Sequence, residues 1–116
     1  MSARIKVAAV ELRTFEGHVF DSRAEMHRYA ELRMLERVGL IRDLALQPEF
    51  ILQEGYVHEG KKIQPIKYFA DFSYLDTKTN TRIVEDCKGM KTEIYNLKKK
   101  MLLFKYPDIN FVEVKA

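Results

Sequence analysis

Two acids and a lysine stand together where an apolar segment ends, in the letters IVEDCK of residues 83–88. The segment has the composition of a β-strand, in which successive side chains point to opposite faces. Asp86 and Lys88 are therefore expected on one face of the strand, and Glu85 and Cys87 on the other. A carboxylate and an ammonium group on one face can bind a cation and stabilise a developing negative charge.

A further acid, Asp71, lies in the middle of the clearest predicted strand, residues 68–75 (YFADFSYL). A turn over residues 76–80 would pair that strand with the next one in antiparallel fashion, which places Asp71 opposite Glu85 or Asp86. Opposed carboxylates repel, and an acid among apolar side chains is costly to desolvate, so a bound divalent cation would explain the pair. Such a metal could polarise a phosphoryl oxygen and lower the pKa of a bound water. The pattern predicts phosphodiester hydrolysis, with an ordinary charged surface as the alternative.

Turns, helix caps and apolar periodicity define the elements that would hold these residues. Ser22 and Glu25 have the S-x-x-E spacing of a capping box, which predicts a helix start. The expected elements are a hairpin over 10–20, a helix over 22–39, a strand over 44–52, a long hairpin loop over 53–67, strands over 68–75 and 82–87, a helix from Thr92 to about Lys105 and a strand over 109–114. This order predicts an α/β fold in which two helices flank a mixed central sheet.

The second predicted helix has an apolar face and a basic environment. Its apolar face is expected to consist of Ile94, Leu97, Met101 and Phe104. Between positions 88 and 105 the chain has six lysines and a single acid, Glu93. This basic block is compatible with a phosphate-backbone partner, and a solvated helix face is the alternative.

Length and composition indicate one globular domain spanning residues 1–116, with residues 1–9 as a candidate flexible N-terminal segment. The lone cysteine, Cys87, excludes an internal disulfide and fits a reducing compartment. The first residues do not resemble a signal peptide, and no apolar segment approaches the roughly 18 residues of a membrane span. We therefore expect a cytoplasmic protein without a membrane partner.

The segments FDSRAE, LQPEF, YFADF and VEDCKGMKT, followed by a lysine-rich helix, together resemble the PD-(D/E)XK nuclease superfamily. They look most like a small phage-associated branch described as candidate endonucleases, and the resemblance covers nearly the whole chain from Val10. It implies a restriction-endonuclease-like core and a DNA endonuclease that uses Mg²⁺ or Mn²⁺. A phage-encoded protein of this kind would act in the cytoplasm of a bacterial host.

The resemblance also implies a role for each site residue. Asp71 and Asp86 match the two motif acids that bind the metal, and Lys88 matches the motif lysine that orients or activates the attacking water. Glu25 matches a helix acid that similar nucleases use as an additional direct or water-mediated ligand. In such sites the backbone carbonyl between acid and lysine, here that of Cys87, also touches the metal, while its thiol would face away as a small core group.

Two assignments have an alternative, and one position departs from the motif. Glu25 is either a site residue or only the capping partner of Ser22. Gln47 is either a neighbour of the site or an ordinary edge-strand amide. Ala70 precedes Asp71 where the motif has proline.

Several lysines are candidate nucleic-acid contacts. Lys91, Tyr95 and Lys98 are spaced to share one helix face just after the site, where they could contact the phosphate backbone or brace the site. Lys61 and Lys62 lie at the tip of the predicted hairpin and could grip a duplex farther away.

The sequence as a whole predicts a metal-dependent DNA endonuclease, with junction or branched DNA among its candidate substrates. The alternatives are a non-catalytic nucleic-acid-binding module on the same fold and a structural phage accessory protein. A homodimer would allow so short a chain to cut both strands of a duplex. The three histidines, His18, His27 and His58, lie in different segments at no metal-ligand spacing and are predicted to be non-catalytic.

Overall fold

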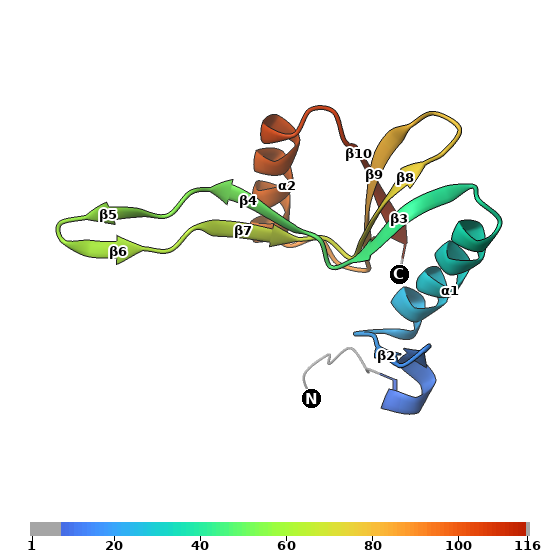
Figure 1. Ribbon diagram of the computed structural model, residues 1–116. Coiled ribbons are helices and arrows are strands. Elements are labelled where there is room, and N and C mark those ends of the chain that lie inside the picture. The colour runs from blue at the N-terminus through green and yellow to red at the C-terminus, as the bar shows by residue number, and fades with distance from the viewer. Residues whose placement is uncertain (1–7, 116) are drawn as a thin grey trace.

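The computed structural model describes residues 8–115, and its centre is a mixed four-stranded sheet (Figure 1). The strand order is β10-β9-β8-β3, with β9 parallel to β10 and antiparallel to β8, and β8 antiparallel to β3. The strands are β3 (Ile41–Leu46), β8 (Phe72–Asp76), β9 (Thr81–Lys88) and β10 (Asn110–Lys115), and the helices are α1 (Arg23–Arg37) and α2 (Glu93–Lys105). The predicted α/β class, with a mixed sheet and two helices, is confirmed.

Both helices begin where the sequence predicts. The Ser22 hydroxyl accepts a hydrogen bond from the Glu25 backbone N–H at 3.1 Å, and Thr92 caps α2 in the same way through the Tyr95 N–H. The chain leaves α1 through Gly39, whose φ of +83° is a conformation that favours glycine. These local signals therefore fix where the two helices start and where α1 ends.

The N-terminal hairpin is shorter than predicted. A 3₁₀ turn, η1 (Val10–Arg13), precedes two two-residue strands, β1 (Thr14–Phe15) and β2 (His18–Val19). Glu16 and Gly17 form the turn with φ values of +49° and +80°, which suit a tight two-residue hairpin. The hairpin packs on α1 through aromatic contacts with Tyr29.

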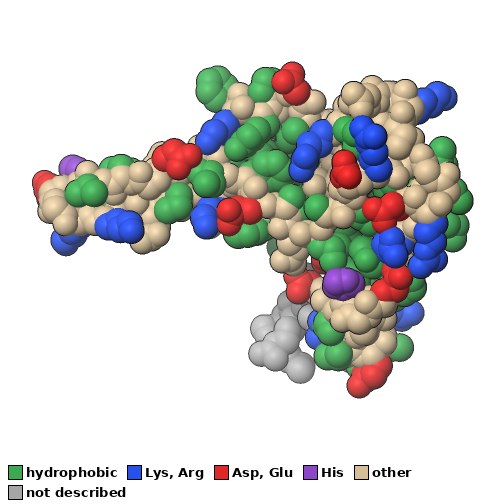
Figure 2. Space-filling view, viewed as in Figure 1, with side chains coloured by type: hydrophobic (Ala, Val, Ile, Leu, Met, Phe, Trp, Pro, Cys, Tyr) green, Lys and Arg blue, Asp and Glu red, His purple; other side chains and the backbone are tan. Residues whose placement is uncertain are grey.

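The prediction of a loop over residues 53–67 is wrong. In the structure this segment forms the outer part of a long two-stranded arm (Figure 1). Short antiparallel strands pair along it, and Glu59 and Gly60, with φ values of +48° and +74°, close the tip. Charged and apolar side chains alternate along its surface (Figure 2). The strands of the arm are β4 (Glu49–Gln53), β5 (Tyr56–His58), β6 (Lys61–Ile63) and β7 (Ile66–Phe69).

Two predicted strands are each broken where the arm joins the central sheet. The strand predicted over 44–52 divides at Gln47, whose φ is +47°, and the strand predicted over 68–75 divides at Asp71. The Gln47 N–H donates to the Asp71 carbonyl at 2.9 Å, and the Ala70 N–H donates to the Pro48 carbonyl at 3.2 Å. Both segments therefore bend at the same place, and Asp71 lies at the bend rather than inside a strand.

The predicted apolar face of α2 is wrong at three of its four positions, whereas the fourth, Met101, packs partly buried against the core. Ile94, Leu97 and Phe104 are 67%, 59% and 91% exposed, whereas Tyr95 and Leu102 are buried against the sheet. The helix has apolar residues on two faces. The buried face includes Tyr95, whose ring also contacts Lys88. No helix in the described part of the chain is long and apolar enough to cross a membrane.

Candidate functional site

The register of β8 and β9 places Asp71 beside Asp86. The pairing of the two strands ends with Phe72 opposite Glu85, directly before Asp71. The Asp71 N–H donates to the Glu85 carbonyl at 3.1 Å, and the Cys87 N–H donates to the Asp71 carboxylate at 2.6 Å. Asp71 therefore contacts β9 through the backbone of Glu85 and Cys87, on either side of Asp86.

The two faces of β9 divide as predicted. Lys88 lies on the α2 side, with its Nζ 3.7 Å from Asp86 Oδ2 and 4.7 Å from the centre of the Tyr95 ring. On the α1 side, Glu85 bonds to a side chain of α1, and Cys87 packs against the core beneath that helix. The Tyr95 ring attracts the Lys88 ammonium through a cation–π contact and supports it close to Asp86.

Asp86 is buried without a hydrogen bond to either carboxylate oxygen. Its residue is 1% exposed, and within residues 8–115 neither oxygen has a hydrogen-bond partner. Burial raises the pKa of Asp86 to about 6, and the nearby Lys88 ammonium opposes that rise. An acid in such a position is costly to keep ionised unless another cation compensates it.

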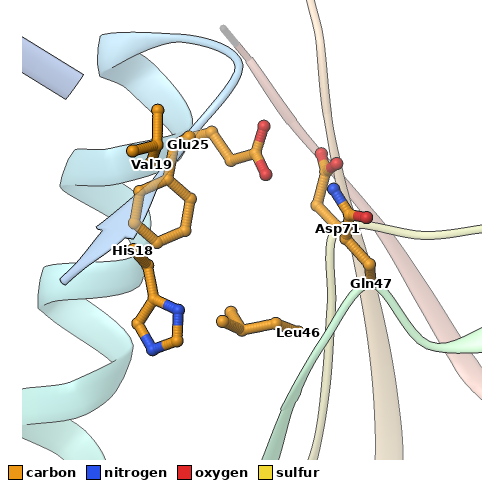
Figure 3. A pocket seen from close by; sticks show the side chains of 7 residues that line it. His18, Val19, Glu25, Leu46, Gln47 and Asp71 are labelled. Carbon is orange, nitrogen blue, oxygen red and sulfur yellow. The ribbon is translucent and has the colours of Figure 1, made fainter. Parts of the chain in front are cut away.

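Glu25 faces the same region from α1. It is 6% exposed, and its carboxylate is turned toward Asp71 across a pocket (Figure 3). Burial, followed by the charge of Asp71, raises the pKa of Glu25 to about 7. In the described chain no hydrogen bond joins this carboxylate to the Ser22 N–H, so only the backbone of Glu25 takes part in the cap. Its side chain remains available to the pocket.

The pocket between α1 and the bend of the strands includes one polar residue that was not predicted to lie there. His18, on β2, lies in its wall through contact with Tyr29, at 5.6 Å between ring centres. Gln47, the predicted neighbour of the site, also lines the pocket. The lining residues are His18, Val19, Phe20, Glu25, Leu46, Gln47 and Asp71 (Figure 3).

The oxygen donors fit a hard divalent cation in type. Burial also raises the pKa of Asp71, against the effect of the Cys87 N–H, so three neighbouring carboxyl groups are all held toward the neutral form. Mg²⁺ commonly uses one or two carboxylates and completes its shell with water. In residues 8–115, however, no group of three or more His, Cys, Asp and Glu side chains stands ready to hold a metal. The fit is therefore to Asp71 and Asp86 with water, and a direct bond from Glu25 requires movement.

Cys87 does not offer its thiol to this site. The side chain packs against the core under α1, and burial raises the pKa of the thiol to about 12. This position agrees with its predicted role as a small core group. Metal coordination by the Cys87 carbonyl stays a prediction.

A buried ion pair ties α1 to the strand that carries Asp86. Arg28 donates from Nε and one terminal nitrogen to the two carboxylate oxygens of Glu85, each at 2.7 Å, and the Tyr74 hydroxyl also donates to Glu85. Glu85 is fully buried. Arg28 is one helical turn after Glu25, so this clamp sets the position of Glu25 relative to Asp86.

A second network of hydrogen bonds and ion pairs holds Tyr95, whose ring contacts Lys88. The Tyr95 hydroxyl donates to Glu113 at 2.6 Å, and Lys99 and Lys91 lie 2.9 Å and 3.3 Å from the same carboxylate. These donors, the Tyr95 hydroxyl first, lower the pKa of Glu113 to about 2. The prediction that Lys91 shares a helix face with Tyr95 is wrong, because Lys91 precedes α2. Tyr95 instead braces the site, which was one of its two predicted roles.

One protein family matches almost the entire chain. Its model, described as "Protein of unknown function (DUF1064)", matches residues 4–116. The chain belongs to the DUF1064 family. No curated protein and no solved structure matches the chain. The function of this DUF1064 protein therefore has to be argued from its own residues.

The remaining predicted nucleic-acid contacts of the DUF1064 chain lie at different distances from the site. Lys98 is half-buried on α2. Lys61 and Lys62 are exposed at the end of the arm, well away from the central sheet (Figure 1). Their contact with nucleic acid stays a prediction.

The DUF1064 protein without metal is expected to lose stability as the pH rises from about 4 through about 7. Glu25 and Asp86 have pKa values near 7 and 6 in the fold, above the ordinary values of 4.5 and 3.8, so their protonated forms favour folding. Their contribution is complete below the unfolded values and is lost through the folded ones. Urea midpoints at pH 5 and pH 8 in a chelator measure this effect, and Glu25→Gln should flatten it. An equal or higher midpoint at pH 8 would contradict the assigned shifts.

Proposed function

We propose that this chain is a divalent-metal-dependent DNA endonuclease of restriction-endonuclease-like fold, related to the PD-(D/E)XK nucleases. The observation that carries the proposal is the carboxylate of Asp86, which is buried without a hydrogen bond beside Asp71 and Lys88. An ionised acid in that position has an ion pair with Lys88 but no hydrogen bond within residues 8–115, so the cost of burying its charge is only partly compensated. A cation bound between Asp86 and Asp71 would offset the cost of burying the carboxylate charge and would explain why an acid is present there.

The residues of the chain divide the chemistry among them. Mg²⁺ or Mn²⁺, when bound, would polarise the phosphoryl group and make a bound water more acidic. Asp71 and Asp86 would hold the ion, and Glu25 would reach it from α1 directly or through a water. Lys88, fixed between Asp86 and the Tyr95 ring, would orient the attacking water and stabilise the negative charge that develops on the phosphate.

The proposed substrate is DNA, with junction and branched forms among the candidates, and a phage-related role is part of the proposal. The basic residues around α2 and on the arm support a phosphate-backbone partner. A symmetric dimer would place two sites on one duplex. That dimer remains a prediction from chain length alone.

A non-catalytic nucleic-acid-binding module on the same fold is the second candidate. Among the described residues the carboxylates do not form a ready three-donor metal cage, which favours a binder over an enzyme. Calorimetry with Mn²⁺ separates the two, because a pure binder has no need of metal binding that depends on Asp86.

Cleavage is expected to depend on Lys88. Linear duplex, nicked, flap and four-way-junction DNA, together with RNA, would be incubated with Mn²⁺ and the wild type, Lys88→Ala or Lys78→Ala. Loss of one charged group that stabilises the transition state typically costs about 10²–10³-fold in rate. Lys88→Ala should therefore be slower by about that factor, while Lys78→Ala, altered in the exposed turn between β8 and β9, should match the wild type. Equal rates for wild type and Lys88→Ala would show that the role given to Lys88 is wrong.

A further inference from the structure

We propose that a second phosphate-binding site lies beside Lys88 on the α2 side of β9, and that it holds the phosphate next to the one that is cut. This inference rests on the proposed function and names a subsite of the same substrate. The site is a cavity separate from the pocket of Glu25. Its lining residues are Lys88, Gly89, Lys91, Glu113, Val114 and Lys115.

Positive charge is in excess in this cavity. Lys88, Lys91 and Lys115 line it with one acid, Glu113, and Lys99 also reaches Glu113 from α2. Lysine ammonium groups bind phosphate as point charges and need no fixed geometry. The cavity therefore has the charge that a phosphodiester requires and lacks the rigid fork that would read a base.

The single acid of the cavity is already committed. Glu113 receives the Tyr95 hydroxyl and the Lys99 ammonium on its two oxygens, and Lys91 lies 3.3 Å from one of them. In the described residues Lys115 makes no ion pair. An entering anion would therefore meet Lys115 and the uncommitted donors of Lys91, with the charge of Glu113 largely balanced by its own partners.

Lys88 connects this cavity to the proposed site. Its ammonium is 3.7 Å from Asp86, and the same side chain lines the basic cavity. A nucleic-acid strand that places one phosphate at Asp86 and Lys88 would therefore bring a neighbouring phosphate toward Lys91 and Lys115. The contact would position the strand without reading its sequence.

The salt dependence of DNA binding tests this subsite. Binding of a fluorescein-labelled duplex would be measured without divalent metal at several salt concentrations, for the wild type, Lys91→Ala/Lys115→Ala and the control Arg42→Ala/Lys78→Ala. Each lost phosphate contact lowers the slope of log K against log salt by about 0.9 for duplex DNA. The first double variant should lose about that much slope. The control removes the same net charge from exposed positions outside the cavity and should keep the slope of the wild type.

A second measurement locates the contact. A single neutral methylphosphonate is placed in turn at phosphates around the cleaved bond. At the neighbouring position it should weaken binding by the wild type and should weaken binding by Lys91→Ala/Lys115→Ala no further. Equal slopes for the two double variants, or equal losses at that position, would overturn the subsite.

The outcomes also separate this inference from the proposed function. A reduced slope with no cleavage under Mn²⁺ would keep the phosphate site and reject the nuclease. Cleavage with an unchanged slope would keep the nuclease and reject the phosphate site. A chain that does not bind DNA at all would reject both.

Discussion

Asp86→Asn is expected to abolish cleavage and to stabilise the metal-free protein at the same time. Loss of a metal-binding acid should slow cleavage by at least about 10²–10³-fold. Burial raises the pKa of Asp86 from 3.8 to about 6, so ionising it above pH 6 costs folding free energy, about 1.4 kcal/mol for each pKa unit. The neutral amide avoids that cost, and the free energy of unfolding at pH 8 should rise by about 1–3 kcal/mol. Urea unfolding in a chelator and cleavage with Mn²⁺ measure the two effects.

The opposite signs distinguish a functional acid from a structural one. Replacement of an acid that only supports the fold would lower the stability of the protein, and cleavage would fall with that stability. Asp108→Asn, a change of the same kind at an exposed position, should alter neither quantity. A less stable Asp86→Asn, with cleavage lost in proportion, would indicate that the carboxylate has a structural partner.

Arg28→Ala is expected to cost the fold about 3–5 kcal/mol, which is a large part of the stability of a domain of this size. Removal of the guanidinium leaves the Glu85 carboxylate fully buried with Tyr74 as its remaining partner. Denaturant unfolding at pH 7 measures the loss. Arg37→Ala is the matched control, since Arg37 is 61% exposed in its pair with Glu16 and such pairs contribute at most about 1 kcal/mol.

A third variant keeps this prediction testable even when Arg28→Ala does not fold. Arg28→Met combined with Glu85→Met removes both charges and fills similar volume, and buried pairs replaced in this way often retain or gain stability. The combined variant should be far more stable than Arg28→Ala. Its site should nevertheless be less well positioned, because Glu25 is then no longer tied to β9. Equal losses for Arg28→Ala and Arg37→Ala would show that the clamp contributes little.

Features that depend on neighbouring residues were accessible from the sequence. The caps at Ser22 and Thr92 are local hydrogen bonds, and the facing of Asp86 and Lys88 follows from strand alternation. The position of Asp71 against residues 85–87 of β9 needed only a short turn between two adjacent strands.

Features set by the packing of distant segments were not accessible. Helix α2 has apolar residues on two faces, and periodicity favoured Ile94 and Leu97 over Tyr95. Tyr95 lies inside because its ring supports Lys88 and its hydroxyl reaches Glu113. The strands of the arm are three to five residues long, which is too short for their side-chain pattern to distinguish them from a loop.

The missed site residues differ in how much signal they left. Arg28 stands three positions after Glu25, and residues at this spacing share a helix face, so a Glu25 turned toward the sheet already indicated an arginine on the same face. The sequence contains no signal for the position of His18, since its place in the pocket depends on how the N-terminal hairpin docks against Tyr29.

The long arm also determines how large the molecule will look in solution. The radius of gyration is 16.4 Å, whereas a compact domain of this length would have about 13 Å. A monomer of 13.7 kDa with this shape should elute early from a sizing column, at the volume of a heavier globular protein. Its elution volume would therefore imitate a dimer, and the number of chains per particle has to be obtained from a mass measurement such as light scattering.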